Sequence, residues 1–197
     1  LPDGKISSRR GKQAVLVDLM EYAHNKAEEI IKDRTFTLEN PADVANKVTS
    51  GVLNYSVLKV ERNKDCVFDM EKAFSFEGET APYMQYTYTR LLSILRKHNT
   101  ETNECDFTCF NTDAFELVKM INNFISTLSI ALEKRDTSIV ARQVMEMCKT
   151  FNHFYTTTKV LDGVDTTTNA KIKLVESLKA CLNVAFKIIC IDTLKEM

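Results

Sequence analysis

Four long stretches after residue 80 repeat their apolar residues at the spacing of an amphipathic helix. They begin near Thr80, Asp113, Asp136 and Asn169. Each keeps its apolar residues on one side of the helical turn, so each needs another surface against which to bury that side. The 197 residues include only 5 glycines and 3 prolines, which argues against a turn-rich all-β chain. The pattern predicts an all-α fold in which these helices pack as a bundle.

The first 80 residues predict shorter elements joined by polar breaks. Residues 13–17 are apolar and β-branched, and we expect them to form an extended link. Asp18, with Glu21 three residues later, predicts the start of a helix through a capping box. Asn40 followed by Pro41 predicts a second helix, because proline is tolerated in the first helical turn. Residues 62–65 predict a turn, and residues 67–74 a short connection.

The net charge of −1 at pH 7 gives the chain no overall attraction to nucleic acid or to an anionic membrane. Any binding of RNA therefore depends on a local patch. No uninterrupted apolar run of about 18 residues is present, so we expect no membrane-spanning segment. The chain begins at Leu1 rather than at methionine, which we interpret as a fragment of a longer protein.

The six cysteines do not have the spacing of a metal site. Cys105 and Cys109 are near each other, but no second pair completes the four ligands of a zinc site. We therefore expect no bound metal, and reduced thiols as in a cytosolic protein.

The most informative stretch is 77–97. Gly78 suits a tight turn, Thr80 is a candidate N-cap and Pro82 fits the first helical turn. The predicted helix has two stripes. One is apolar and faces a core: Met84, Tyr88, Leu91 and Leu95. The other lies on a neighbouring flank: Tyr83, Tyr86 and Arg90. Aromatic rings and a guanidinium on one flank suit unpaired bases. The spacing also fits a half-buried tyrosine pair beside an exposed arginine, an arrangement common on helical surfaces, so it leaves both interpretations open.

A basic segment near the start, residues 3–12, is bounded by glycines. Its four cations, which suit the negative charge of phosphate groups, are Lys5, Arg9, Arg10 and Lys12. A solvated loop or a frayed terminus is the alternative that the residues themselves leave open.

Three blocks of sequence closely resemble arginyl-tRNA synthetases of class I. They are Asp3-Gly-Lys-Ile-Ser-Ser-Arg-Arg-Gly, Phe74-Ser-Phe-Glu-Gly-Glu-Thr-Ala-Pro-Tyr-Met-Gln-Tyr with the helix that follows, and residues 170–197. Departures from the family pattern are Ile6 for methionine, Ser8 for a second lysine and Lys171 for arginine. The glycines usual near residues 183 and 190 are also absent.

The resemblance implies a fold and a set of sites. Residues 1–38 correspond to the tail of the catalytic domain, a loop plus a helix, and residues 39–197 to the all-α, DALR-type anticodon-binding domain. The signature loop implied to face the ATP phosphates is Lys5, Ser7, Ser8, Arg9 and Arg10. The implied RNA-binding residues are Ser75, Phe76, Glu77, Gly78, Glu79, Thr80, Tyr83, Tyr86, Arg90, Tyr155 and Met197.

The resemblance also implies an activity for the parent protein. It would activate L-arginine with ATP and Mg²⁺ and attach it to arginine tRNA, as a cytoplasmic monomer with no membrane association. This chain lacks the first class I signature and the arginine pocket, so we expect it to bind no cofactor and to be inactive alone. Two alternatives remain. One is a freestanding helical module that binds RNA or protein, and the other is an unrelated bundle with its tyrosines in the core.

Overall fold

A computed structural model describes residues 16–32, 40–99 and 102–195. These residues form helices and connecting loops and contain no strand, which confirms the all-α prediction. The helices are α1 Leu16–Lys32, α2 Pro41–Leu58, α3 Met70–Ala73, α4 Ala81–Lys97, the 3₁₀ turn η2 Phe107–Cys109, α5 Thr112–Lys134, α6 Ser138–Thr157 and α7 Asp165–Ile188. The predicted signature loop (residues 5–10) and Met197 lie outside the described residues.

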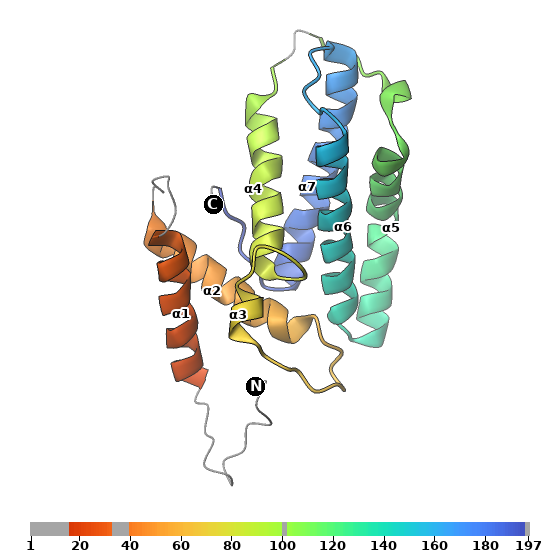
Figure 1. The fold of residues 1–197 in the computed structure, drawn as a ribbon. Coiled ribbons are helices and arrows are strands. Elements are labelled where there is room, and N and C mark those ends of the chain that lie inside the picture. Colours follow the sequence, from red (N-terminus) through yellow and green to blue (C-terminus); the bar gives the residue numbers. More distant parts are fainter. Residues whose placement is uncertain (1–15, 33–39, 100–101, 196–197) are drawn as a thin grey trace.

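Helices α4, α5, α6 and α7 run side by side as a bundle (Figure 1). Their apolar faces meet in the main core, as the periodicity predicts. Among its fully enclosed side chains are Met84, Leu91, Leu117, Val144, Met147, Phe151, Leu178 and Leu182. Burying a side chain of this size contributes about 1.5–3 kcal/mol relative to exposure, so these faces supply most of the drive toward the bundle.

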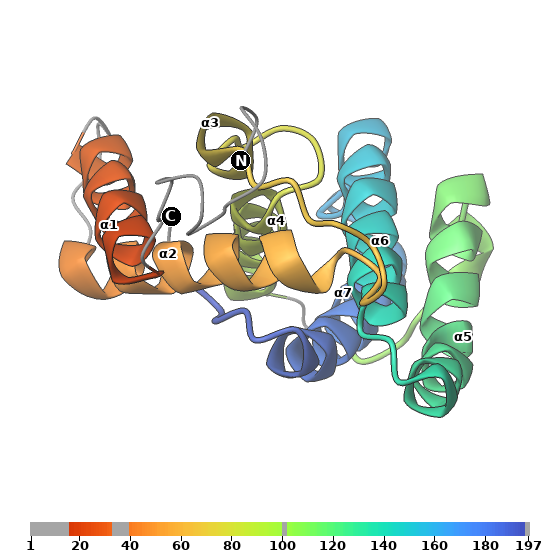
Figure 2. The same ribbon diagram turned by 90° about the horizontal axis from the view of Figure 1, so that it is seen from below.

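A second, smaller core lies between α1 and α2. Its buried members come from both helices, from the connection before α4 and from the end of the chain: Ala23, Ala27, Val44, Ala45, Val48, Val52, Phe74 and Leu194. Helix α2 crosses the lower end of the bundle and reaches α6 (Figure 2). The segment after α7 returns toward α1, so residues from the two ends of the chain share this core (Figure 1).

Two of the predicted helix starts are confirmed. The Asn40 side chain accepts a hydrogen bond from the Asp43 N–H (3.2 Å), and the Thr80 hydroxyl accepts one from the Tyr83 N–H (3.2 Å). In both helices proline occupies the first turn. Gly78, just before α4, has a φ of +79°, which a residue with a Cβ rarely adopts.

The other four starts differ from the prediction. Residues 16 and 17 are already helical, so Asp18 lies in the first turn of α1. In α5 the cap is Asn111, whose side chain accepts from the Ala114 N–H (3.0 Å), and Asp113 follows inside the helix. In each case an acidic residue of the first turn, which interacts favourably with the helix dipole, has the same sequence signature as a cap.

Helices α6 and α7 also begin at other residues than expected. Helix α6 starts at Ser138, and Asp136 accepts from the Ser138 N–H (3.0 Å) although it stands one residue before the N-cap. Helix α7 starts at Asp165, four residues before Asn169. Asp162 accepts from the Val164 N–H and the Thr168 hydroxyl, which lets a threonine-rich stretch begin a helix.

Helix α5 lies at the outer edge of the bundle (Figure 2). By length and composition it is apolar enough to cross a membrane. The sequence prediction, which looked for an uninterrupted apolar run, did not identify this property. The inner face of α5 packs on α6 and α7 through Leu117 and Phe124. Its outer face exposes Phe115, Ile125 and Leu132.

Candidate functional site

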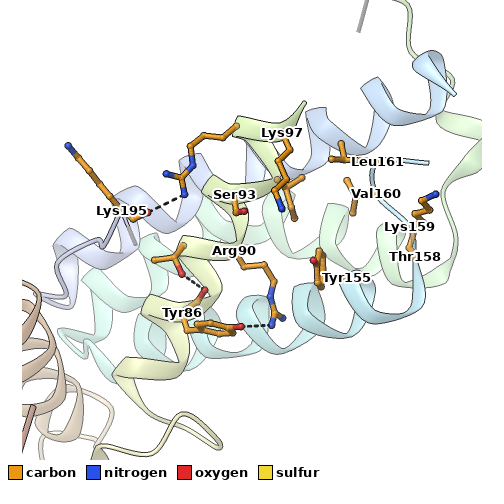
Figure 3. Close-up of a pocket in the computed structure, with 13 residues that line it drawn as sticks. Tyr86, Arg90, Ser93, Lys97, Tyr155, Thr158, Lys159, Val160, Leu161 and Lys195 are labelled. Carbon is orange, nitrogen blue, oxygen red and sulfur yellow. Dashed lines mark hydrogen bonds between the residues drawn. The ribbon is translucent and has the colours of Figure 1, made fainter. Parts of the chain in front are cut away.

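A groove of about 640 Å³ runs along α4 (Figure 3). Its other walls are the end of α6, the segment 158–161 and the stretch before the C-terminus. Among the described residues, its lining includes no acidic side chain and five cations: Arg90, Arg96, Lys97, Lys159 and Lys195. A chain with a net charge of −1 therefore has a groove that is locally electropositive and suited to an anion.

Arg90 lies between two tyrosine rings at the centre of this groove. Its guanidinium carbon is 4.9 Å from the centroid of the Tyr86 ring and 4.8 Å from that of Tyr155. Both distances fall within the range of a cation–π contact. Tyr86 and Tyr155 remain 37% and 40% exposed. The arrangement therefore places two partly open aromatic rings beside a fixed positive charge.

Hydrogen bonds to neighbouring side chains fix the position of Arg90. Its Nη1 donates to Asn152 Oδ1 (2.6 Å), and its Nη2 donates to the Tyr86 hydroxyl (3.3 Å). The Asn152 amide nitrogen donates in turn to the Thr87 hydroxyl (2.8 Å), and Thr87 is fully buried. The guanidinium is therefore anchored to the core, which lowers the entropy that a ligand would lose in ordering it.

The loop 75–80 precedes α4 and is stabilised by its own hydrogen bonds. The Thr80 hydroxyl donates to the Ser75 carbonyl (2.6 Å), and the Ser75 hydroxyl accepts from the Glu77 N–H (3.0 Å). Glu77 and Gly78 are exposed at its tip, and Phe76 is half-buried. An added Cβ at Gly78 would meet nothing within 4 Å, so its positive φ, rather than crowding, accounts for the glycine.

Glu79 holds this loop against α6. Its carboxylate accepts a hydrogen bond from Lys149 Nζ (2.9 Å), and its carbonyl accepts one from Lys59 Nζ (3.0 Å). The hydrogen bond from Lys149 keeps the pKa of the Glu79 carboxyl below its usual value. Glu79 is therefore ionised at neutral pH and is already paired with a cation.

The segment 158–161, which carries Lys159, is fixed by a half-enclosed ion pair. Lys171 Nζ donates to the Asp162 carboxylate (2.7 Å) and to the Lys159 carbonyl (3.0 Å). Burial would raise the pKa of Asp162, but hydrogen bonds from Lys171, Thr168, Thr167 and the Val164 N–H outweigh it and lower that pKa. Lys171 thus helps to hold in place the segment that carries the groove cation Lys159.

The structure brings together only some of the predicted RNA-binding residues. Tyr86, Arg90 and Tyr155 meet in the groove, and the loop 75–80 lies at the base of the same helix. Tyr83 is half-buried against the main core and does not line the groove. Among the described residues no group of three or more His, Cys, Asp and Glu side chains has the arrangement of a metal site.

Four groove cations and Asn152 are absent from the sequence prediction. Lys97 lies two helical turns after Arg90 on the same flank as Tyr86 and was detectable in principle, and Arg96 precedes it. Lys159 reaches the groove from the segment after α6 and Lys195 from the segment after α7. Asn152, in α6, bonds to Arg90. No local spacing links them to α4.

Known proteins show consistent similarity to this chain. The model of the DALR anticodon binding domain family matches residues 84–197. An arginine–tRNA ligase of Clostridium botulinum (strain Alaska E43 / Type E3) is 36% identical over 197 residues, and one of Clostridium beijerinckii is 38% identical over the same length. Each alignment covers 99% of this chain and 35% of the relative, so the chain spans about a third of their length.

Solved structures have the same arrangement of helices. The Thermus thermophilus arginyl-tRNA synthetase superposes with a TM-score of 0.87 at 25% identity, covering 93% of this chain and 32% of that one. An arginyl-tRNA synthetase from Plasmodium falciparum gives a TM-score of 0.82 at 20% identity, covering 92% of this chain and 33% of that one, which supports the fold alone.

Proposed function

The chain belongs to the DALR anticodon-binding domain family, and from that membership we propose that it is the RNA-binding, C-terminal part of an arginine–tRNA ligase. The electropositive groove that contains Tyr86, Arg90 and Tyr155 carries the proposal. It combines cations for a phosphate backbone with aromatic rings for unstacked bases, which is what a single-stranded RNA loop requires.

In this proposal the two kinds of side chain have different tasks. Tyr86 and Tyr155 stack on bases of the anticodon loop, at about 1–3 kcal/mol per base. The lysines and arginines contact phosphates and position the RNA without reading its sequence. Tyr83 and the loop 75–80 contact the RNA beside the groove, and Met197 contributes at the end of the chain. In that loop Glu79 holds the backbone in place rather than meeting phosphate, since Lys149 already neutralises it.

The parent protein supplies the chemistry. We assign residues 1–38 to the tail of its catalytic domain and residues 39–197 to the anticodon-binding domain. Lys5, Ser7, Ser8, Arg9 and Arg10 would face the phosphates of ATP, bound with Mg²⁺, while arginine is activated. The parent is proposed to be a cytoplasmic monomer, and this chain alone to be inactive. Relatives match 99% of the chain, including the residues before the DALR match, which favours a ligase over a freestanding module.

The direct test compares two RNAs. The chain is titrated with arginine tRNA and with the same tRNA carrying a changed anticodon loop, at one salt concentration. We expect tighter binding to the arginine tRNA, by at least about tenfold, from the loss of one stacked base in the changed loop. Equal binding to both by the chain and by the full-length parent would contradict the proposal. Discrimination by the parent alone would show that docking needs the N-terminal parts.

A further inference from the structure

Gln85, one residue before Tyr86, is fully buried and makes two bonds to distant parts of the chain. Its Nε2 donates to the Lys47 carbonyl in α2 (3.1 Å) and to the Asp192 carbonyl after α7 (3.0 Å). Both partners only accept hydrogen bonds, so the NH₂ group must face them. Its Oε1 is buried without a partner, a cost that an apolar side chain would avoid. The two donated bonds are what the amide adds at this position.

The segment 189–195, called the tail below, receives side-chain donors at three of its carbonyls. Asn54 Nδ2 donates to Cys190 O (2.8 Å), Gln85 to Asp192 O and Arg96 Nη2 to Lys195 O (3.4 Å). Asn54 is half-buried and Arg96 is exposed, so water competes for their bonds. Gln85 is the donor from which water is excluded, so its bond is the strongest of these three side-chain hydrogen bonds to the tail.

The packing around Gln85 is close on the side of α2. A Cβ added to Gly51 would lie 3.2 Å from Gln85 Nε2 and 3.4 Å from the Ala81 Cβ. Glycine at position 51 lets α2 and α4 lie close enough for the Gln85 amide to donate to α2 and to the tail at the same time. A larger residue would displace the amide.

We propose that Gln85 is a positioning residue for the groove: it fixes the tail so that Lys195 lies on the groove wall, and it ties that wall to α2. The role in RNA binding rests on the proposed function. The placement of the tail does not, because it depends only on contacts within the free protein.

The first experiment needs no RNA. Hydrogen exchange is measured in the tail and around residues 44–51 for the wild type, Gln85→Met and Gln143→Met. Gln143 donates to the Met120 carbonyl between α6 and α5 (3.5 Å) and serves as the matched control. We expect faster exchange in both segments for Gln85→Met only. Gly51→Ala, which displaces the amide without removing it, should act in the same direction and is used if Gln85→Met does not fold. Unchanged exchange would overturn the proposal.

The second experiment is a double-mutant cycle on RNA affinity. Lys195→Ala should weaken binding about two- to fivefold, as for the loss of one exposed ion pair. If Gln85 acts through the tail, Gln85→Met gives a similar loss and the double variant is no weaker than either. Additive losses would overturn the role in positioning Lys195. A wild type that does not bind arginine tRNA, even as full-length parent, would overturn the proposed function and leave the exchange result standing.

Discussion

At the scale of single residues, Arg90 is the centre of the candidate site. It contacts two tyrosine rings and bonds to Asn152 (2.6 Å), which bonds to buried Thr87. Because these contacts exist without a ligand, the rings and the charge are already in position for the RNA loop that we propose as the ligand. Preorganisation of this kind converts more of each contact into affinity.

Tyr86→Ala should weaken binding to arginine tRNA by about ten- to a hundredfold, because it removes one stacking ring worth about 1–3 kcal/mol. Tyr86→Phe keeps the ring and loses only the bond to Arg90, so it should bind nearly as the wild type does. The measurement is an equilibrium titration beside a thermal melt. Tyr22→Ala, at an exposed residue of α1, is the control. Wild-type affinity in Tyr86→Ala with an intact fold would remove Tyr86 from the site.

The sequence predicted part of the site at this scale. Tyr86 and Arg90 share a helix, and their spacing places them on one flank. Tyr155 came only from the resemblance, since it is 65 residues away from Arg90 in a helix with an ordinary apolar stripe. The same stripe included Tyr83, which packs against the core. Whether a flanking residue faces a groove or a neighbouring helix depends on what packs there, which spacing does not reveal.

At the scale of elements, the helix starts show where local signals compete. Asn111 and Asp113 both precede the apolar stripe of α5, and the acidic residue followed by Glu116 resembles a capping box. In the structure the Asn111 side chain accepts from Ala114 N–H, while Asp113 accepts from the Thr157 hydroxyl in α6. Asp113 therefore makes a contact between α5 and α6 and does not cap the helix.

Replacing each residue in turn distinguishes these roles. Asn111→Ala should lower the free energy of unfolding by about 1 kcal/mol, the usual cost of a lost N-cap. Asp113→Ala loses an exposed bond and a favourable charge near the helix start, and should cost about 0.5 kcal/mol. Chemical denaturation of both variants measures the difference. An equal or larger loss in Asp113→Ala would contradict the assignment of the cap to Asn111.

The loop between α6 and α7 depends on the pair of Lys171 and Asp162. Lys171→Met should lower the free energy of unfolding by about 2–3 kcal/mol near pH 7, because it leaves a partly enclosed carboxylate without its cation. The cost is below that of a fully buried pair since 24% of the Asp162 side chain is exposed.

The effect of Lys171→Met should depend on pH in a definite direction. The pKa of Asp162 is lowered in the folded protein, so its stabilisation is complete above the ordinary aspartate pKa of about 4 and is lost as the pH falls below it. The difference between wild type and Lys171→Met should therefore stay nearly constant down to about pH 5 and shrink from there to about pH 2. Denaturation curves across this range measure it, and a constant difference would assign the loss to packing alone.

At the scale of the whole molecule, the fold class and the inward faces of the four long helices were predictable from periodicity. Each of these helices buries a stripe read directly from the sequence, as with Val140, Val144 and Phe151 in α6. The second core was not predictable as a unit. It joins α1 and α2 to Phe74 and Leu194, and no local pattern shows that a segment after α7 returns to the first helices.

Leu194→Ala tests that long-range contact. It should lower the free energy of unfolding by about 2–4 kcal/mol, as for other large-to-small changes in a core. It should also speed hydrogen exchange in α1 and α2 more than in α6. Leu132→Ala, at a side chain that is 80% exposed on α5, should change neither quantity by a measurable amount. If Leu194→Ala changes the free energy of unfolding and the hydrogen exchange no more than Leu132→Ala does, the packing of Leu194 does not stabilise this core.

The return of the tail also sets an order of events during synthesis. The ribosome adds Ala23 and Val44 to the chain long before it adds Leu194, which completes the core that they share. Until then α1 and α2 have an apolar face with an open position, while α4, α5 and α6 already have each other to pack against. Of the described helices, α1 and α2 are made first, yet their shared core is among the last to be completed, and their apolar faces are where a chaperone would find exposed surface on the growing chain.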